Sequence, residues 1–361
     1  MKKSLVLFSA MLFVLLLGGA GCLSISTGGS KVKTSGPAGM FVSVNQGDTW
    51  KQIASWPTTE GVKNISNVSV YKLIEDPSDT KAMYLATRAN GLFYTYDDGK
   101  TWQHAEGALS TGFIYDVTIH PTNKCTIYAS TGSRIYRTDD CSRNWTEVYR
   151  ESRSGIRTVS LAFSQTSPYK IFAAESNGDV LQSFDSSNSW SILNRFKTNI
   201  TDIITHPKNT RLMYIITRTN GIYRSYDAGS TWVNLKDKMS DFSGSSTYRR
   251  HFIDPDDANR IYWVSTYGIL VSETAGDSWS AYDLITPPGS ADIYGFAIDT
   301  KDHNNIYYTA TIGSRSTFYR SIDGGINWET KKLPTAQIPA LLRVHPDHPE
   351  WVYAGFTVPT S

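Results

Sequence analysis

The chain has 361 residues, of which 40% are hydrophobic and 12% aromatic, so it can bury a large core in one large β domain or two ordinary ones. Its 35 basic residues nearly cancel 33 acidic ones, and the formal net charge of +2 gives no case for a nucleic-acid binder. The 21 Tyr and 10 Trp favour strands over helices.

The start of the chain carries an export signal and a linker. Residues 1–21 hold a positively charged start, an apolar run and a small-residue stretch, which is typical of a signal peptide. Cys22 follows at once, so the segment resembles a bacterial lipoprotein signal with Cys22 as the acylated residue, although Gly19 stands where that family prefers Leu. Plain secretion and an uncleaved anchor are the alternatives. Residues 22–37 are rich in Ser, Gly, Thr and Lys and predict a flexible tether.

One eight-residue pattern then recurs seven times in the chain. It reads Ser/Thr-x-Asp-x-Gly-x-Thr-Trp, and Ser225–Trp232 is a regular copy. The six steps from the first copy to the last average about 46 residues, which fits one four-stranded blade of a β-propeller. The other copies start at Ser43, Thr95, Thr138, Ser183, Ser272 and Ser321.

A second pattern lies between these boxes: an apolar strand, a turn built on His-Pro or Asp-Pro, and a strand containing Ile-Tyr or Val-Tyr. It also occurs seven times, for example at 203–217 with its turn at His206–Pro207. The chain opens with a box half at 39–50 and closes with a turn half at 342–356. These orphan halves predict one composite blade, which closes the ring and protects the sheet edges. We therefore expect an all-β fold, a seven-bladed propeller of four-stranded antiparallel blades, over residues 38–361.

The strands of each blade are named A to D from the axis outward. The Pro turn joins A to B, a short loop joins B to C, and the box joins C to D. Because antiparallel strands alternate in direction, the Pro turns and boxes share one face, the box face. The B–C loops and the D–A connections share the other, the loop face.

The box residues are those expected of a hairpin turn. Asp can accept hydrogen bonds from its own turn, Gly can adopt a positive φ, and Trp can bury a large area against the neighbouring sheet. Some copies differ, with Asn45 and Thr274 in place of Asp and with Ser142 and Ser187 in place of Gly. The boxes lack the acidic run and bidentate Glu of a calcium loop, so no metal is expected there. The structural residues are Asp97, Trp102, Asp140, Trp145, Asp185, Trp190, Asp227, Trp232, Asp323 and Trp328.

These repeats resemble the Asp-box, or bacterial neuraminidase repeat, family of β-propellers over nearly all of the chain beyond residue 38. The segment His206–Trp232 looks most like sortilin-type propellers and xyloglucan-cleaving glycosidases. Size and blade number are also similar to photosystem II assembly factors. The resemblance implies a fold and leaves the function open. A sialidase is disfavoured, because the Arg-Ile-Pro-type motif of that family is absent from this sequence and sialidases have six blades.

Two cysteines remain beyond Cys22. The hairpin that contains them turns near Gly132–Ser133, which places Cys125 and Cys141 opposite each other across strands B and C, at a separation that a disulfide can bridge. Export favours the oxidised pair, and two buried free thiols are the alternative. The histidines are spread over different blades, so we expect no metal site and no other cofactor.

Arginine and tyrosine gather where the loop face is expected. This composition predicts a binding face for a peptide or a glycan, because Arg and Tyr are enriched at interaction hot spots; an ordinary solvated surface is the alternative. Lys72, Asp116, Asp202 and Arg343 fall on A strands, nearest the axis. The predicted binding residues are Arg88, Tyr115, Arg157, Arg218, Arg249, Arg250, Tyr267, Tyr294 and Arg315.

The favoured interpretation is a non-catalytic, monomeric propeller that binds an unidentified protein or glycan. An N-terminal lipid on Cys22 would hold it on the cell envelope of a bacterium, and without that lipid it would be secreted. One alternative is a glycoside hydrolase with paired carboxylates at Asp116 and Asp202, although no local signature marks these acids. A scaffold similar to photosystem II assembly factors is the other alternative.

Overall fold

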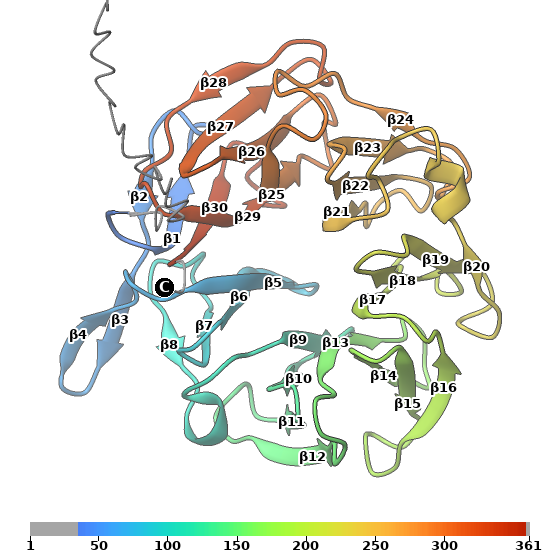
Figure 1. The fold of residues 1–361 in the computed structure, drawn as a ribbon. Helices are drawn as coiled ribbons and strands as arrows, with labels where there is room; N and C mark the ends of the chain where they lie inside the picture. The colour runs from blue at the N-terminus through green and yellow to red at the C-terminus, as the bar shows by residue number, and fades with distance from the viewer. Residues whose placement is uncertain (1–34, 359–361) are drawn as a thin grey trace, which may run out of the picture. The chain divides into compact units, whose positions relative to one another are not determined.

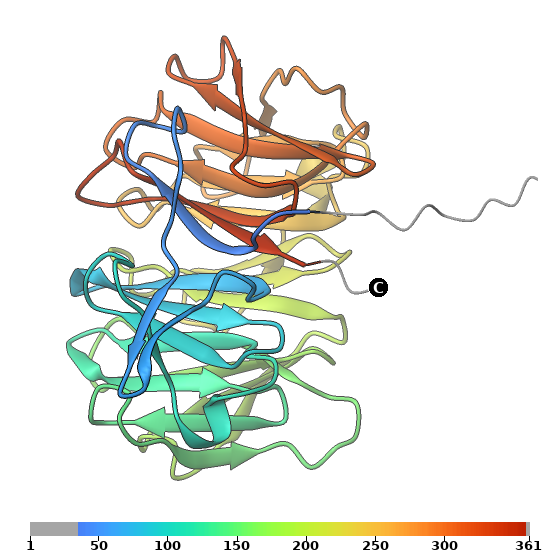
Figure 2. The ribbon, with the colours of Figure 1, turned by 90° about the vertical axis from the view of Figure 1, so that its left-hand side faces the viewer.

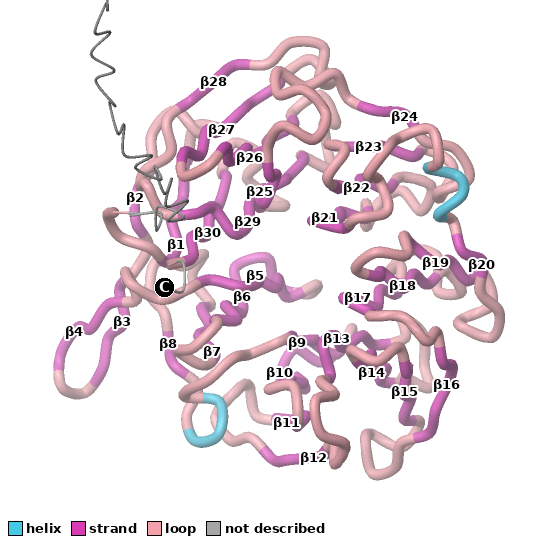
Figure 3. The backbone as a smooth tube through the Cα atoms, in the orientation of Figure 1, coloured by secondary structure: helices cyan, strands magenta, loops and turns pink. Residues whose placement is uncertain are grey.

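The computed structural model describes residues 35–358, which belong to one compact unit. The signal segment and Cys22 lie outside the described residues. Seven four-stranded antiparallel sheets surround a central axis (Figure 1). Figure 3 shows how strongly strands dominate; the helical parts drawn there are two 3₁₀ turns, η1 (Gly107–Leu109) and η2 (Lys236–Met239). The predicted fold class is confirmed.

Six blades follow one another along the chain, each built from four consecutive strands. Blade 1 contains β5 (Val70–Asp76), β6 (Asp79–Thr87), β7 (Leu92–Thr95) and β8 (Gln103–His104), and blade 2 contains β9 (Asp116–His120), β10 (Asn123–Ser130), β11 (Arg134–Thr138) and β12 (Thr146–Arg150). Blade 3 contains β13 (Thr158–Phe163), β14 (Ile171–Glu175), β15 (Asp179–Ser183) and β16 (Ser191–Arg195), and blade 4 contains β17 (Ile200–Thr205), β18 (Met213–Thr217), β19 (Ile222–Ser225) and β20 (Val233–Asn234). Blade 5 contains β21 (Tyr248–Ile253), β22 (Ile261–Ser265), β23 (Ile269–Ser272) and β24 (Ser280–Ala281), and blade 6 contains β25 (Asp292–Ile298), β26 (Ile306–Ile312), β27 (Arg315–Ser321) and β28 (Glu329–Lys331).

Blade 7 is the composite blade that the sequence predicts. Its inner strands are β29 (Ile338–Val344) and β30 (Val352–Thr357), and its outer strands are β1 (Gly39–Ser43) and β2 (Lys51–Gln52), in the order β2-β1-β30-β29. The register between the two chain ends runs from Gly39 opposite Phe356 to Ser43 opposite Val352. Figure 2 shows the N-terminal strand in blue beside the C-terminal strand in red. Five ladder pairs thus close the ring without a covalent link.

The box at the end of β19 shows why its residue types recur. Asp227 accepts a backbone hydrogen bond from Thr231 (2.8 Å) and the hydroxyl proton of Ser225 (2.7 Å). The Ser225 hydroxyl in turn accepts the backbone N–H of Gly229 (2.8 Å). Ala228 and Gly229 have φ values of 56° and 91°, so the turn contains two successive left-handed residues. The box is therefore a self-contained hydrogen-bonded turn, as predicted.

The divergent boxes keep the same geometry with other atoms. Asn45 and Thr274 accept the equivalent backbone bond through a side-chain oxygen, at 2.9 and 2.8 Å. Ser142 and Ser187 adopt φ values of 70° and 71° where the other boxes carry glycine. A serine in the left-handed region is strained by roughly 1–2 kcal/mol, which these turns tolerate because the surrounding ladder holds them.

The hydrophobic core is divided into seven clusters, each between two neighbouring blades. The box tryptophans belong to these interfaces. Trp102 is fully buried and donates its indole N–H to the carbonyl of Ile53 (2.9 Å), while Trp50 meets Phe318 of blade 6 edge-on at 5.5 Å. Neighbouring blades therefore pack against each other through the same motif that folds the outer turn.

A hairpin outside the blades was not predicted. It consists of β3 (Ser55–Thr58) and β4 (Gly61–Asn64), lies between β2 and blade 1, and projects from the ring in Figure 1. All four residues of β4 are exposed. Within residues 35–358, no helix is long and apolar enough to cross a membrane.

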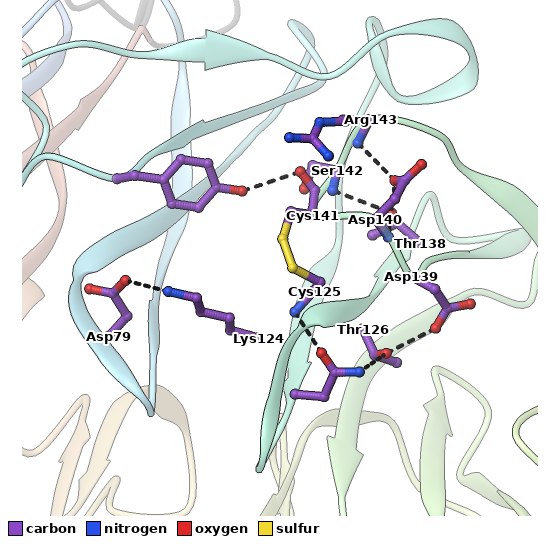
Figure 4. Close-up of a disulfide and its surroundings, with 12 residues drawn as sticks. Asp79, Lys124, Cys125, Thr126, Thr138, Asp139, Asp140, Cys141, Ser142 and Arg143 are labelled. Atoms are coloured by element: carbon purple, nitrogen blue, oxygen red, sulfur yellow. Dashed lines mark hydrogen bonds and ion pairs between the residues drawn. A yellow bond between two sulfur atoms is a disulfide. The ribbon is translucent and has the colours of Figure 1, made fainter.

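Cys125 and Cys141 form a disulfide with their Cα atoms 4.0 Å apart (Figure 4), which confirms the predicted pair. The backbone N–H of Cys141 also donates to the carbonyl of Cys125 (3.3 Å). The paired register of the two strands ends at Ile127 opposite Thr138. The bridge therefore joins the irregular start of β10 to the box turn, beyond the regular ladder.

Candidate functional site

The seven A strands, β5, β9, β13, β17, β21, β25 and β29, surround the axis (Figure 1). Six of them carry a shift in register near their first residues, and β9 begins at the equivalent place. A bulge of this kind changes the direction of the side chain that follows it. The residues at this position around the ring are Lys72, Asp116, Ser160, Asp202, Arg250, Gly295 and Leu341.

Three charged members of this ring form an ion network across the axis. The ammonium nitrogen of Lys72 lies 3.2 Å from Asp116 and 3.2 Å from Asp202, whose side chains are only 7% and 14% exposed. The hydroxyl of Ser160 contacts both carboxylates, at 2.8 Å from Asp116. The backbone N–H of Leu161 completes the shell around Asp116 at 2.9 Å. This channel network joins blades 1 to 4.

The network sets the protonation of its members. Burial opposes the charge on Lys72, but the two carboxylates outweigh it and raise the pKa of Lys72 above its ordinary value. Burial raises the pKa of Asp116, and Lys72 offsets this only in part. For Asp202 the effect of burial is outweighed by Lys72 and His251, so its pKa is lowered. One ammonium group therefore balances two carboxylates, of which Asp116 takes up a proton more readily.

Both acids of the predicted catalytic pair are hydrogen-bonded within this network. All four carboxylate oxygens of Asp116 and Asp202 have a protein partner among Lys72, Ser160 and backbone N–H groups. A general acid needs a proton to donate and a nucleophile needs an open approach. Both acids are held by these partners, and both also line the larger central cavity described below.

His251 extends the network into blade 5. Burial lowers its pKa to about 4, so the imidazole is neutral at pH 7. Its Nδ1 lies 3.0 Å from the hydroxyl of Tyr248, and its Nε2 lies 3.8 Å from Asp202. The hydroxyl of Tyr248 can therefore donate to Nδ1 while the N–H on Nε2 faces the carboxylate.

Two adjoining cavities occupy the centre of the ring. The larger has a volume of about 390 Å³ and is lined by Lys72, Asp116 and Asp202 of the channel network together with Tyr71, Arg250 and Tyr294. The smaller, of about 280 Å³, lies toward the Pro turns. Both are lined by Glu75, His251, Phe252 and Arg343.

Arg88 and three aromatic side chains stand beside the larger cavity on the loop face. The guanidinium of Arg88 lies over the rings of Tyr71 and Phe113, at 5.1 and 5.8 Å from their centroids. Phe113 stacks on Tyr115 at 4.2 Å. Burial and the charge of Arg250 lower the pKa of Arg88, which nevertheless keeps its charge at neutral pH.

The two neighbouring arginines of β21 have different partners. Arg250 donates to the backbone carbonyls of Tyr294 (2.8 Å) and Ala340 (2.6 Å), which ties blade 5 to blades 6 and 7. Arg249 forms an ion pair with Asp292 at 3.1 Å. Both arginines lie within β21.

The remaining predicted residues are spread around the loop face. The side chains of Arg157 and Tyr115 cover Gly132, and Tyr267 packs edge-on against Phe242 at 5.3 Å. Arg218 is exposed in the loop after β18, whereas Arg315 is exposed as the first residue of β27, not within the loop itself.

Several members of the site were missed from the sequence. Ser160 could have been found by aligning the seven A strands, because it occupies the position of Lys72 and Asp202. Tyr71 and Glu75 lie on the same strand as Lys72. Phe113 lies in a D–A connection, where no repeat marks it.

Comparisons with known proteins agree with this fold. A family model described as sortilin, neurotensin receptor 3, matches residues 38–177. A xyloglucanase of Paenibacillus sp is 25% identical over 266 residues, which cover 66% of this chain and 23% of that protein. An oligoxyloglucan-reducing end-specific xyloglucanase of Emericella nidulans is 21% identical over 74% of this chain and 39% of its own length. The match thus spans well under half the length of these curated relatives.

Solved structures show the same architecture. YCF48 from Cyanidioschyzon merolae has a TM-score of 0.59 and 15% identity, covering 80% of this chain and 95% of that chain. YCF48 bound to D1 peptide has a TM-score of 0.57 and 14% identity, covering 81% and 94%. An extracellular domain of a one-component system from B. thetaiotaomicron has a TM-score of 0.57 and 12% identity, covering 81% and 42%. The chain is a seven-bladed propeller of Asp-box repeats, similar in fold to these proteins.

Proposed function

We propose that this chain is a non-catalytic binding module whose loop face takes an acidic segment of a protein or an acidic glycan. The observation that carries the proposal is the pairing of its arginines. Within residues 35–358, five of the predicted arginines form no ion pair with an acidic side chain. They are Arg88, Arg157, Arg218, Arg250 and Arg315.

Most arginines elsewhere in the described part of the propeller are paired with a carboxylate; Arg143, Arg211 and Arg343 are the exceptions. Arg137, Arg153 and Arg224, for example, lie 2.8, 2.7 and 3.0 Å from a carboxylate oxygen. Unpaired guanidinium groups beside half-buried aromatic rings suit a ligand that brings its own carboxylates or sulfates. A propeller of similar fold has been solved with a peptide bound, which supports a binding role for this architecture.

Export and lipidation are part of the proposal. Cys22 and residues 1–21 would place the propeller on a membrane surface through N-terminal acyl chains. Intact-mass analysis of the protein from the membrane fraction tests this, and an unmodified Cys22 would contradict it.

Binding is tested with an acidic glycan array and with pull-down from envelope extracts, comparing the unmodified protein with an R88A/R218A/R315A variant. Loss of these charges is expected to weaken binding to acidic probes by at least about tenfold, with a strong dependence on salt. R150A/R195A is the matched control, because both arginines lie on outer strands and are exposed. Equal loss in the control, or binding that is indifferent to salt, would contradict an acidic ligand.

A glycoside hydrolase is the second candidate, favoured by the xyloglucanase relatives and by the shared hydroxyl between Asp116 and Asp202. Incubation with xyloglucan and measurement of new reducing ends tests it. Turnover that D116A or D202A abolishes would establish the hydrolase and overturn the binding module.

A further inference from the structure

The box-face end of the central channel holds two opposite charges that no described residue satisfies. Glu75 lies on β5, three residues beyond Lys72, and Arg343 lies on β29 of the composite blade. Both line the smaller cavity of about 280 Å³. This end of the channel faces away from the arginines of the loop face.

Glu75 is a buried acceptor without a donor. Its Oε1 is shielded from solvent and has no hydrogen-bond partner among the described residues. Burial raises the pKa of Glu75, and the charge of Arg343 opposes this only in part. A buried polar atom left unpaired costs roughly 1–3 kcal/mol, so such atoms in native proteins usually have a partner that is a water, an ion or a ligand.

Arg343 is the complementary donor. Its guanidinium lies 5.9 Å from the ring centroid of Phe252, and it makes no hydrogen bond and no ion pair with any residue in the range 35–358. Glu75 and Arg343 do not form an ion pair with each other, although both line the same cavity.

Much of the remaining lining of the cavity is apolar or hydrogen-bonded within the protein. Ile204, Phe252 and Ile298 contribute apolar surface. Asp299 accepts the backbone N–H of Lys301 at 2.9 Å, as expected for a turn residue. Glu75 and Arg343 are therefore an acid and a base on the neighbouring inner strands β5 and β29, set against a hydrophobic wall.

We propose that this cavity binds a free α-amino acid with an apolar side chain. Its ammonium group would meet Glu75, its carboxylate would meet Arg343, and its side chain would lie against Phe252 and the isoleucines. The cavity volume is close to the lower end of small-molecule sites, which run from about 300 to 1,000 Å³. This site is separate from the loop face, so the proposal does not depend on the acidic ligand proposed there.

Three probes of equal shape test the two charges separately by isothermal titration calorimetry: L-leucine, L-leucinamide and 4-methylpentanoate. Leucinamide lacks the carboxylate and 4-methylpentanoate lacks the ammonium group. Leucine is expected to bind at least about tenfold more tightly than either analogue, because each loses one charged hydrogen bond.

Two variants assign each charge to its partner. E75Q should make leucine and 4-methylpentanoate bind equally, and R343M should make leucine and leucinamide bind equally. E147Q and R150M are the matched controls, because this ion pair (2.7 Å) lies on the outer strand β12 and should leave all three affinities unchanged. If a channel variant does not fold, the ranking of the three probes on the unmodified protein decides.

The proposal is overturned by any of three results. The first is that leucine, phenylalanine and glycine all fail to bind at millimolar concentration. The second is that leucinamide binds as tightly as leucine, which would leave a site for cations alone. The third is that E75Q and R343M bind leucine as tightly as the unmodified protein does.

Discussion

Replacing Lys72 by methionine tests the channel network most directly. The side chain keeps its length and loses its charge, so Asp116 and Asp202 remain buried on either side of Ser160 without a cation. Removing one partner of a buried ion pair costs about 3–5 kcal/mol, because the remaining charge is left uncompensated. We expect K72M to lose that much free energy of unfolding at pH 7.

The loss should depend on pH in a defined direction. An aspartate in the unfolded chain titrates near a pKa of about 3.9. Without Lys72, burial and mutual repulsion raise the pKa values of the two carboxyls in the folded state. The folded state then binds more protons than the unfolded state, so stability falls as pH rises from about 4 to 7. The difference between K72M and the unmodified protein should be small at pH 4 and largest at pH 7.

Equilibrium urea unfolding followed by tryptophan fluorescence measures this difference. The variant K72M/D116N/D202N should recover most of the lost stability, because it removes the unpaired charges. K124M is the matched control: the ion pair of Lys124 with Asp79 (3.2 Å) is exposed, so its loss should cost at most about 1 kcal/mol. A cost for K72M no larger than that of K124M, or one that does not change with pH, would refute the network as described.

Three further predictions concern the blades. The G276A variant should lose about 1–3 kcal/mol of free energy of unfolding in the same assay, because Gly276 has a φ of 97° and an added Cβ would lie 2.5 Å from Leu235. An unchanged urea midpoint would show that the box can relax. C125A/C141A should lower stability by about 3 kcal/mol, since the bridge closes a loop with a sequence separation of 16, and non-reducing peptide mapping of the unmodified protein should recover the two cysteines in one cross-linked species. Burial and a neighbouring glutamate raise the pKa of Glu175 to about 7, so this group makes the fold less stable as pH rises from about 5 to 7. The E175Q variant should lose that decline in stability between pH 5 and pH 8. An unaltered dependence of stability on pH would contradict this prediction.

The blades could be predicted because their information is local. The side-chain hydrogen bonds of the box at Ser225–Trp232 all fall within eight residues, so the residue types needed for the turn recur wherever a blade does. Counting these copies and noting which half stands at each end predicts the composite blade 7. The disulfide was predictable for the same reason, because Cys125 and Cys141 belong to one hairpin.

The site depended on contacts that no local pattern encodes. Lys72 and Asp202 are 130 residues apart and meet because the closed ring brings the A strands of blades 1 and 4 to one axis. The sequence places both residues on A strands but cannot show that Lys72 lies between two aspartates and forms an ion pair with each. Likewise, nothing near Glu75 or Arg343 in the chain indicates that both line one cavity. Local sequence patterns are thus enough to predict the architecture, whereas the closure of the ring sets which charges are neutralised and which are left for a ligand.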